Sequence, residues 1–320
     1  MPNPTIHRIT LAGFLITLLG AVLFSTKAIF VKLAFRETGV DALTLLFLRM
    51  LFSLPFYLFA VWLNSRKENQ RPMSGKDWLW IAAMGILGYY LSSLFDFIGL
   101  QYISAGLERL ILFLYPTFAV LINTFFFKTT LNRTQIIALA LTYLGIGIAY
   151  FGELHLDTSN PQFFFGSFMI FLCAITYSFY LVGTGRMVPK LGTTRYTAYS
   201  MLAATAGIFV HFLLMQDTAT IPFSVTLTWY SIAIAVIATV LPSFMMSNGM
   251  KRIGSNNVSI ITSIGPVSTI IQAHFFLGEK IIAEQVFGTA LVIAGVLLIG
   301  WQSRSVDKNT TCGQHVRRES

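Results

Sequence analysis

Charged residues are scarce in this chain, and their scarcity argues against a soluble fold. Asp, Glu, Lys and Arg make up 11% of the 320 residues, while hydrophobic residues make up 55%. The mean hydropathy is +0.70. A soluble globular domain carries about 25% charged residues. The composition therefore predicts an integral membrane protein.

Cysteine and the common catalytic motifs are nearly absent as well. The two cysteines, Cys173 and Cys312, form neither a disulfide framework nor a metal-site spacing. No Walker-type phosphate loop, His-x-x-x-His motif or paired-Asp motif is present, so we expect no nucleotide hydrolysis, metal, cofactor or catalytic residue. The net charge of +9 would suggest nucleic acid as the partner of a soluble protein, but basic loops on one side of a membrane explain it here.

Long apolar runs are what the chain does have. Each is about 20 residues long, enough for an α-helix to cross roughly 30 Å of hydrocarbon. The predicted spans are 11–33, 41–62, 78–99, 102–127, 134–151, 163–183, 195–215, 229–248, 256–277 and 283–301. We therefore expect an all-α protein with ten transmembrane helices. Residues 1–10 are predicted to be a cytoplasmic N-terminus without a cleavable signal, and residues 302–320 a disordered basic tail near anionic lipid.

The distribution of Lys and Arg predicts the orientation. The N-terminus, the even-numbered loops and the tail hold sixteen of these residues, whereas the odd-numbered loops hold three. The positive-inside rule then places both termini in the cytoplasm of a bacterial-type inner membrane. All five Trp lie at predicted span ends, where an aromatic belt belongs: Trp62, Trp78, Trp80, Trp229 and Trp301.

The two halves of the chain resemble each other. A shift of 150 residues aligns 96–151 with 246–301 without a gap, and ten of the 56 positions are identical. The alignment predicts one repeat over 11–152 and another over 163–301. Because each repeat holds an odd number of helices, the second is expected to be inverted, as in secondary transporters.

Pro116 and Pro266 occupy equivalent positions within predicted spans. Proline removes a backbone hydrogen bond and tends to kink a helix. The pair is consistent with matched hinges beside a central site, and equally with two static kinks that improve packing.

Several short motifs of the chain stand in a characteristic order and spacing: Tyr102-Ile103-Ser104-Ala105-Gly106, Tyr115-Pro116, Gly265-Pro266, Leu277-Gly278-Glu279-Lys280, and Gly145 with Gly295. In this respect residues 11–301 resemble the EamA branch of the drug/metabolite transporter superfamily. The resemblance implies ten helices in two inverted repeats, a central cavity, and transport of small metabolites, often export of amino acids or related compounds. Lys128-Thr129 departs from the Gly-Glu pair that the family often has after the fourth helix.

Five charged residues fall within the predicted spans: Lys27, Arg49, Asp96, Glu108 and Arg109. Charges there cost roughly 2.5–3.5 kcal/mol each and are candidates for a solute or ion path. At 1.5 Å per residue, all five lie in one layer roughly 5–12 Å below the outer surface. At the shift of 150 their equivalents are uncharged: Tyr177, Tyr199, Met246, Val258 and Ser259. The fold itself therefore does not require these charges.

The five are the predicted substrate-binding residues, each with a structural alternative. Arg49 is suited to clamp a carboxylate or phosphate in bidentate fashion, or else it pairs with Glu108 or Asp96. Lys27 is expected to meet an anionic group of the solute, the alternative being that it extends outward to the membrane surface.

Glu108 and Arg109 diverge by about 100° on a helix, so one is expected to line the cavity while the other pairs with a neighbouring helix. Asp96 is shallow enough to reach interfacial water, and a solvated helix end is favoured over a role in solute binding. His211 and His274 are expected to be structural. Five tyrosines have hydroxyls that a cavity could use, but the sequence does not orient them: Tyr89, Tyr90, Tyr115, Tyr177 and Tyr180.

These features together predict a secondary transporter for a small polar metabolite, amino acid-like or otherwise carboxylate-bearing, that works by alternating access. Glu108 or Asp96 is a candidate carrier of a coupling proton. A membrane-embedded lipid-modifying enzyme and a channel are the alternatives, although the chain has no filter-like loop. Glycines in the fifth and tenth spans (Gly145, Gly147, Gly288 and Gly295) allow close helix contact within one chain or in a homodimer.

Overall fold

The computed structural model describes residues 10–65, 72–127, 133–156, 160–215, 224–253, 258, 261–295 and 297–298. Most of the predicted N-terminus, all of the tail 302–320 and the Lys128-Thr129 pair lie outside these residues. The described residues are almost entirely helical and contain no strand. The expectation of an all-α membrane protein is confirmed.

The described first half forms α-helices and one π-helical segment, η1. Their bounds are α1 Leu11–Thr38, α2 Ala42–Ser65, α3 Gly75–Gly85, η1 Ile86–Leu91, α4 Ser92–Leu100, α5 Ala105–Leu112, α6 Tyr115–Phe127 and α7 Arg133–Leu156. The segments α3, η1 and α4 follow one another without a break and form the third predicted span.

The described second half forms a similar series of helices. Their bounds are α8 Phe163–Leu191, α9 Thr193–Met215, α10 Val225–Ala235, η3 Val236–Val240, α11 Leu241–Ile253, α13 Gly265–Gln272, η4 Ala273–Leu277 and a last helix Ala283–Gly295. Within the described residues, eight helices are long and apolar enough to cross a membrane. The ninth and tenth predicted spans fall partly outside the described residues.

Polar caps and glycines mark where several helices begin and end. Ser104 accepts a hydrogen bond from the Leu107 N–H (3.0 Å), which satisfies one free donor in the first turn of α5. The helices α1 and α8 are followed by Gly39 and Gly192, with φ of 63° and 80°. Residues with a Cβ rarely adopt such angles, so these glycines allow the chain to leave the helix.

Several structural features recur at the spacing found in the sequence. The helices α3 and α10 begin 150 residues apart, at Gly75 and Val225, and each continues into a π-helical segment. The helices α6 and α13 begin at Tyr115 and Gly265, again 150 residues apart. The two halves therefore share one π-helical distortion and two helix starts at the spacing of 150 residues.

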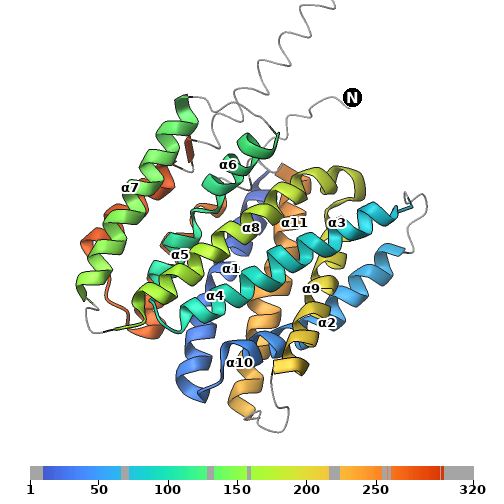
Figure 1. Ribbon diagram of the computed structural model, residues 1–320, viewed down its shortest axis with the longest axis horizontal. Helices are drawn as coiled ribbons and strands as arrows, with labels where there is room; N and C mark the ends of the chain where they lie inside the picture. The colour runs from blue at the N-terminus through green and yellow to red at the C-terminus, as the bar shows by residue number, and fades with distance from the viewer. Residues whose placement is uncertain are drawn as a thin grey trace, which may run out of the picture.

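The two halves are interleaved in space (Figure 1). The first helix, α1, packs against α10, η3, α11 and α13, all from the second half. Its counterpart α8 packs against α3, η1, α4 and α6, all from the first half. The helices α2 and α9 pack against each other. Residues far apart in the sequence are thereby brought together in the interior.

The sequence suggested that Pro116 and Pro266 kink continuous helices, but the structure shows a different arrangement. Each is the second residue of a new helix, and two turn residues precede that helix: 113–114 before α6 and 263–264 before α13. Proline is tolerated there because an N–H in the first turn has no partner within the helix. The helices are interrupted at these points.

The last helix lies beside α7 at one edge of the molecule (Figure 1). A Cβ on Gly145 would come within 2.5 Å of the Gly288 backbone oxygen, so the contact needs glycine. A Cβ on Gly295 would come equally close to Thr142. These glycines serve a contact within one chain, whereas Gly147 has nothing within 4 Å of its Cβ position.

Candidate functional site

Lys27, Asp96 and Glu108 form one buried group between α1, α4 and α5. The Lys27 Nζ lies 2.7 Å from the Asp96 carboxylate and 3.9 Å from the Glu108 carboxylate. Asp96 and Glu108 are 1% and 0% exposed. Neither carboxylate receives a hydrogen bond from any other group in the described residues. One ammonium therefore serves two buried carboxylates.

The prediction that Asp96 occupies a solvated helix end is wrong. The residue lies near the end of α4, but α1, α2 and α5 pack against this helix, and α8 covers it as well. Depth along a single helix cannot show which neighbours cover a side chain. The ion pair with Lys27 is thus made in the protein interior.

Arg49 on α2 has neutral partners. Its Nε donates to the Thr239 hydroxyl on η3 (3.1 Å), and its Nη1 donates to the Ser93 hydroxyl on α4 (3.2 Å). The guanidinium also lies over the Phe97 ring, 5.6 Å from its centroid. Arg49 is 4% exposed, and it forms no ion pair with a carboxylate of the described residues.

Arg109 follows Glu108 directly but points elsewhere. Its guanidinium lies over the rings of Phe24 and Phe113, with 5.4 and 5.7 Å to the centroids. The residue is 6% exposed, and its Nε has no hydrogen-bond partner in the described structure. A Cβ built on Gly265 would lie 2.7 Å from the Arg109 Nη2, so the guanidinium rests on the first residue of α13.

Four of the five tyrosines singled out in the sequence form a continuous chain. The rings of Tyr115 and Tyr177 meet edge to face at 5.3 Å, and Tyr177 contacts Tyr180 at 5.8 Å. The hydroxyl of Tyr180 lies 2.9 Å from that of Tyr89. The fifth, Tyr90, instead bonds the Nδ1 of His211 (2.8 Å). The chain runs along α8 from the break before α6 to η1.

Two serines that sequence reasoning missed stabilise the broken helices. The Ser25 hydroxyl on α1 lies 3.3 Å from the Gly265 backbone oxygen, and the Ser178 hydroxyl on α8 lies 2.9 Å from the Tyr115 backbone oxygen. Each hydroxyl thus lies between a carbonyl of its own helix, that of Ala21 or Ala174, and the carbonyl of the first residue after a break. Their spacing of 153 matches that of the caps Gly39 and Gly192, so α1 and α8 align with a shift of 153.

That shift revises one equivalence drawn from the sequence. Aligned on the caps, Lys27 corresponds to Tyr180 and not to Tyr177. The counterpart is uncharged in both alignments. The buried charges remain a feature of the first half.

Glu279 also proves to connect the two halves. Its carboxylate accepts hydrogen bonds from the N–H groups of Ala105 (2.9 Å) and Gly106 (3.3 Å) in the first turn of α5. The Lys32 Nζ lies 3.9 Å away and donates to the Ile103 carbonyl (2.6 Å). A carboxylate is favourable at a helix N-terminus, because the unpaired N–H groups there carry partial positive charge.

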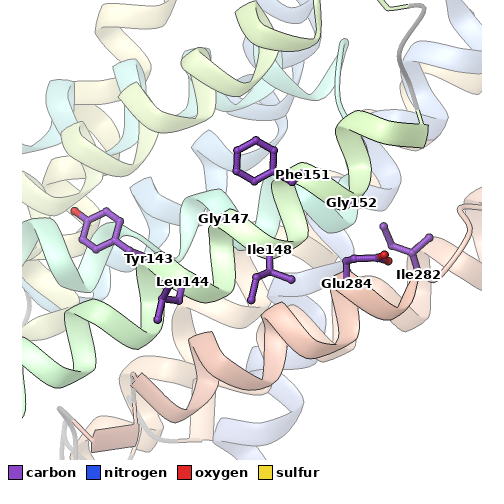
Figure 2. A pocket seen from close by; sticks show the side chains of 8 residues that line it. All are labelled: Tyr143, Leu144, Gly147, Ile148, Phe151, Gly152, Ile282 and Glu284. Carbon is purple, nitrogen blue, oxygen red and sulfur yellow. The ribbon is translucent and has the colours of Figure 1, made fainter.

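A groove of about 730 Å³ lies between α7 and the start of the last helix (Figure 2). It is lined by Tyr143, Leu144, Gly147, Ile148, Phe151, Gly152, Ile282 and Glu284. None of the five buried charged residues lines it. The groove is therefore separate from the charged layer.

The family model for the EamA-like transporter family matches this chain twice, over residues 11–151 and 164–301. The chain belongs to the EamA-like transporter family. It is 30% identical over 285 residues to the uncharacterized transporter YcbK of Bacillus subtilis. The aligned residues cover 87% of this chain and 89% of YcbK. It is 24% identical over 291 residues to an uncharacterized transporter of Archaeoglobus fulgidus, over 89% and 94% of the two chains.

This EamA-like transporter also matches a solved crystal structure with a TM-score of 0.63. The match covers 92% of this chain and 97% of the other at 18% identity, which establishes a shared fold. Together with the apolar helices, the family places the chain among multi-pass membrane transporters. The resemblance stated from the short motifs is confirmed.

Proposed function

We propose that this EamA-like transporter exports a small carboxylate-bearing solute, such as an amino acid or a related metabolite, by alternating access. The observation that carries the proposal is an excess of buried positive charge. Three cations and two carboxylates are buried in the described first half, and both carboxylates are beside Lys27. Neither Arg49 nor Arg109 lies within 4 Å of a carboxylate of the described residues. A solute with an anionic group would supply the missing charge.

For the architecture, we propose ten helices in two inverted repeats, with both termini in the cytoplasm of a bacterial inner membrane. The family model matches each half separately, and both halves carry π-helical segments and helix starts at a spacing of 150 residues. Their interleaved packing suits a transporter in which one part rocks against the other around a central site.

The breaks before Pro116 and Pro266 would serve as hinges in this motion. A break frees backbone groups, and here a hydroxyl from the other half contacts the carbonyl after each break. Pro116→Ala and Pro266→Ala should leave solute affinity nearly unchanged while lowering the turnover rate. Equal turnover in both variants and wild type would identify the prolines as static.

Asp96 and Glu108 would carry a coupling proton. Two carboxylates share one ammonium, so a proton on either would remove excess negative charge from this buried group. Transport by wild type should then respond to a pH gradient, whereas Glu108→Gln should transport at a rate independent of the gradient. An undiminished response in both Glu108→Gln and Asp96→Asn would exclude this role.

The test of the function is transport by purified protein in proteoliposomes, with a panel of labelled amino acids and simple carboxylates. Wild type should carry at least one carboxylate-bearing solute, and Arg49→Met should slow its transport at least tenfold. Lys76→Ala, an exposed residue outside the charged layer, is the matched control. Transport restricted to cationic or uncharged solutes would refute the proposed substrate class.

A further inference from the structure

Arg109 is the buried cation with the fewest partners. Lys27 has two carboxylates, and Arg49 has two hydroxyl acceptors. The Arg109 guanidinium carries five N–H donors, yet in the described residues it lies over aromatic rings, its Nε has no hydrogen-bond partner, and no carboxylate lies within 4 Å of it. A buried guanidinium normally has a hydrogen-bonded partner, because an unpaired one loses its hydration without compensation.

The location of this guanidinium makes the lack of a partner more unfavourable. It lies against Gly265, the first residue of α13. The N–H groups at the start of a helix are not bonded within it and carry partial positive charge, although Pro266 supplies no N–H here. The guanidinium therefore lies beside the start of a helix, which is itself partly positive. An anion bound between the two would relieve their repulsion.

The surroundings would strengthen binding of an anion. Phe24 and Phe113 flank the guanidinium and exclude water from it. In such an apolar environment, attraction between opposite charges is much stronger than in water. Gly265 permits the guanidinium to lie this close to α13, because a Cβ at this position would displace the Arg109 Nη2.

We propose that the Arg109 guanidinium and the first turn of α13 form the subsite that binds the carboxylate of the solute. This inference rests on the proposed function and deepens it, because it assigns the anionic group of the solute to one place. Arg49 then has a supporting role through its hydroxyl partners, and Lys27 stabilises Asp96 and Glu108. The subsite joins α5 of the first half to α13 of the second, so an anion bound there would bridge the two halves.

The experiment measures thermal unfolding of the purified protein in detergent, with sodium butyrate as probe. Butyramide in sodium chloride of the same ionic strength is the uncharged control. Butyrate should raise the Tm of wild type by about 2–4 °C once the site is mostly occupied, and butyramide should not.

Arg109→Met distinguishes a binding group from a structural one. If Arg109 binds the anion, the Arg109→Met variant without ligand should unfold at the same temperature as wild type or higher, and butyrate should no longer raise its Tm. Lys76→Ala, an exposed residue away from the buried charges, should keep the butyrate shift. Gly265→Ala keeps all charges but displaces the guanidinium, so it should unfold near wild type and show a smaller shift.

Two results would overturn the subsite. One is a butyrate shift in Arg109→Met equal to that of wild type. The other is a lower Tm of ligand-free Arg109→Met together with an unchanged shift in Gly265→Ala. Either would leave the transport of carboxylates standing. Absence of any carboxylate from the solutes carried in proteoliposomes would instead refute the proposed function itself.

Discussion

The Lys27 ammonium lies 2.7 Å from the Asp96 carboxylate, in an interior where both side chains are almost fully buried. The pair joins α1 to α4, and Glu108 on α5 lies within 3.9 Å of the same ammonium. Because the carboxylates have no other donor in the described residues, Lys27 holds three helices of the first half together.

Removal of the Lys27 charge should therefore destabilise the protein strongly. Lys27→Met leaves two carboxylates in the interior without a cation, and breaking a buried pair typically costs about 3–5 kcal/mol. Thermal unfolding in detergent should show a large decrease in Tm. The double variant Lys27→Met with Asp96→Asn should recover part of the loss. A single variant as stable as wild type would show that the pair contributes nothing.

Glu279 should protect the amides in the first turn of α5 from hydrogen exchange. Glu279→Ala removes the acceptor for the Ala105 and Gly106 N–H groups, and loss of such a cap costs about 0.5–2 kcal/mol. Hydrogen exchange of the amides in 105–108 should become faster. Glu284→Ala is the matched control, since its carboxylate lies in the groove beside α7. Equal exchange in both variants would rule out the capping role.

Gly88 on η1 should not tolerate a side chain. A Cβ there would overlap the Cβ and ring of Tyr180 on α8, and overpacking of this kind costs about 1–3 kcal/mol. Gly88→Ala should lower the Tm. Gly147→Ala, with nothing within 4 Å of the added Cβ, should be neutral or slightly stabilising because alanine favours the helix. Similar Tm values for the two variants would contradict this close contact.

The serine contacts at the helix breaks should contribute measurably to the free energy of unfolding. Ser178→Ala removes a hydrogen bond to the Tyr115 carbonyl and should destabilise by about 0.5–1.5 kcal/mol. Thr176→Val is the control, because the Thr176 hydroxyl bonds only carbonyls of its own helix. The difference between the two in thermal unfolding reports the contact across halves, and no difference would mean that the contact is not made.

Several features of the fold were predictable because they depend on local sequence. Apolar runs produced eight of the predicted spans within the described residues, with ends that differ from the predicted ones by up to five residues. The divergence of Glu108 and Arg109 follows from helix geometry alone, and the structure shows them facing different partners. The recurrence at 150 residues was visible in the sequence and reappears in the π-helical segments.

Other features depended on how the helices are rotated and packed. Sequence reasoning favoured Arg49 as the anion clamp, yet Arg49 has hydroxyl partners on Ser93 and Thr239, whereas the Nε of Arg109 has no hydrogen-bond partner in the described residues. It also left Asp96 at a solvated end, although three other helices of the first half and one of the second contact α4. Neither outcome follows from depth in the membrane.

The sequence by itself determined that the chain crosses a membrane and where eight of its spans lie. These properties depend on hydrophobicity along the chain and on the constant rise of a helix. Only the tertiary structure decided which charges pair. Arg49 and Thr239 are 190 residues apart, and Arg109 meets Gly265 only because α5 packs on a helix of the other half. Such contacts depend on the rotation of each helix about its axis, which is set by packing between helices and not by any single stretch of sequence.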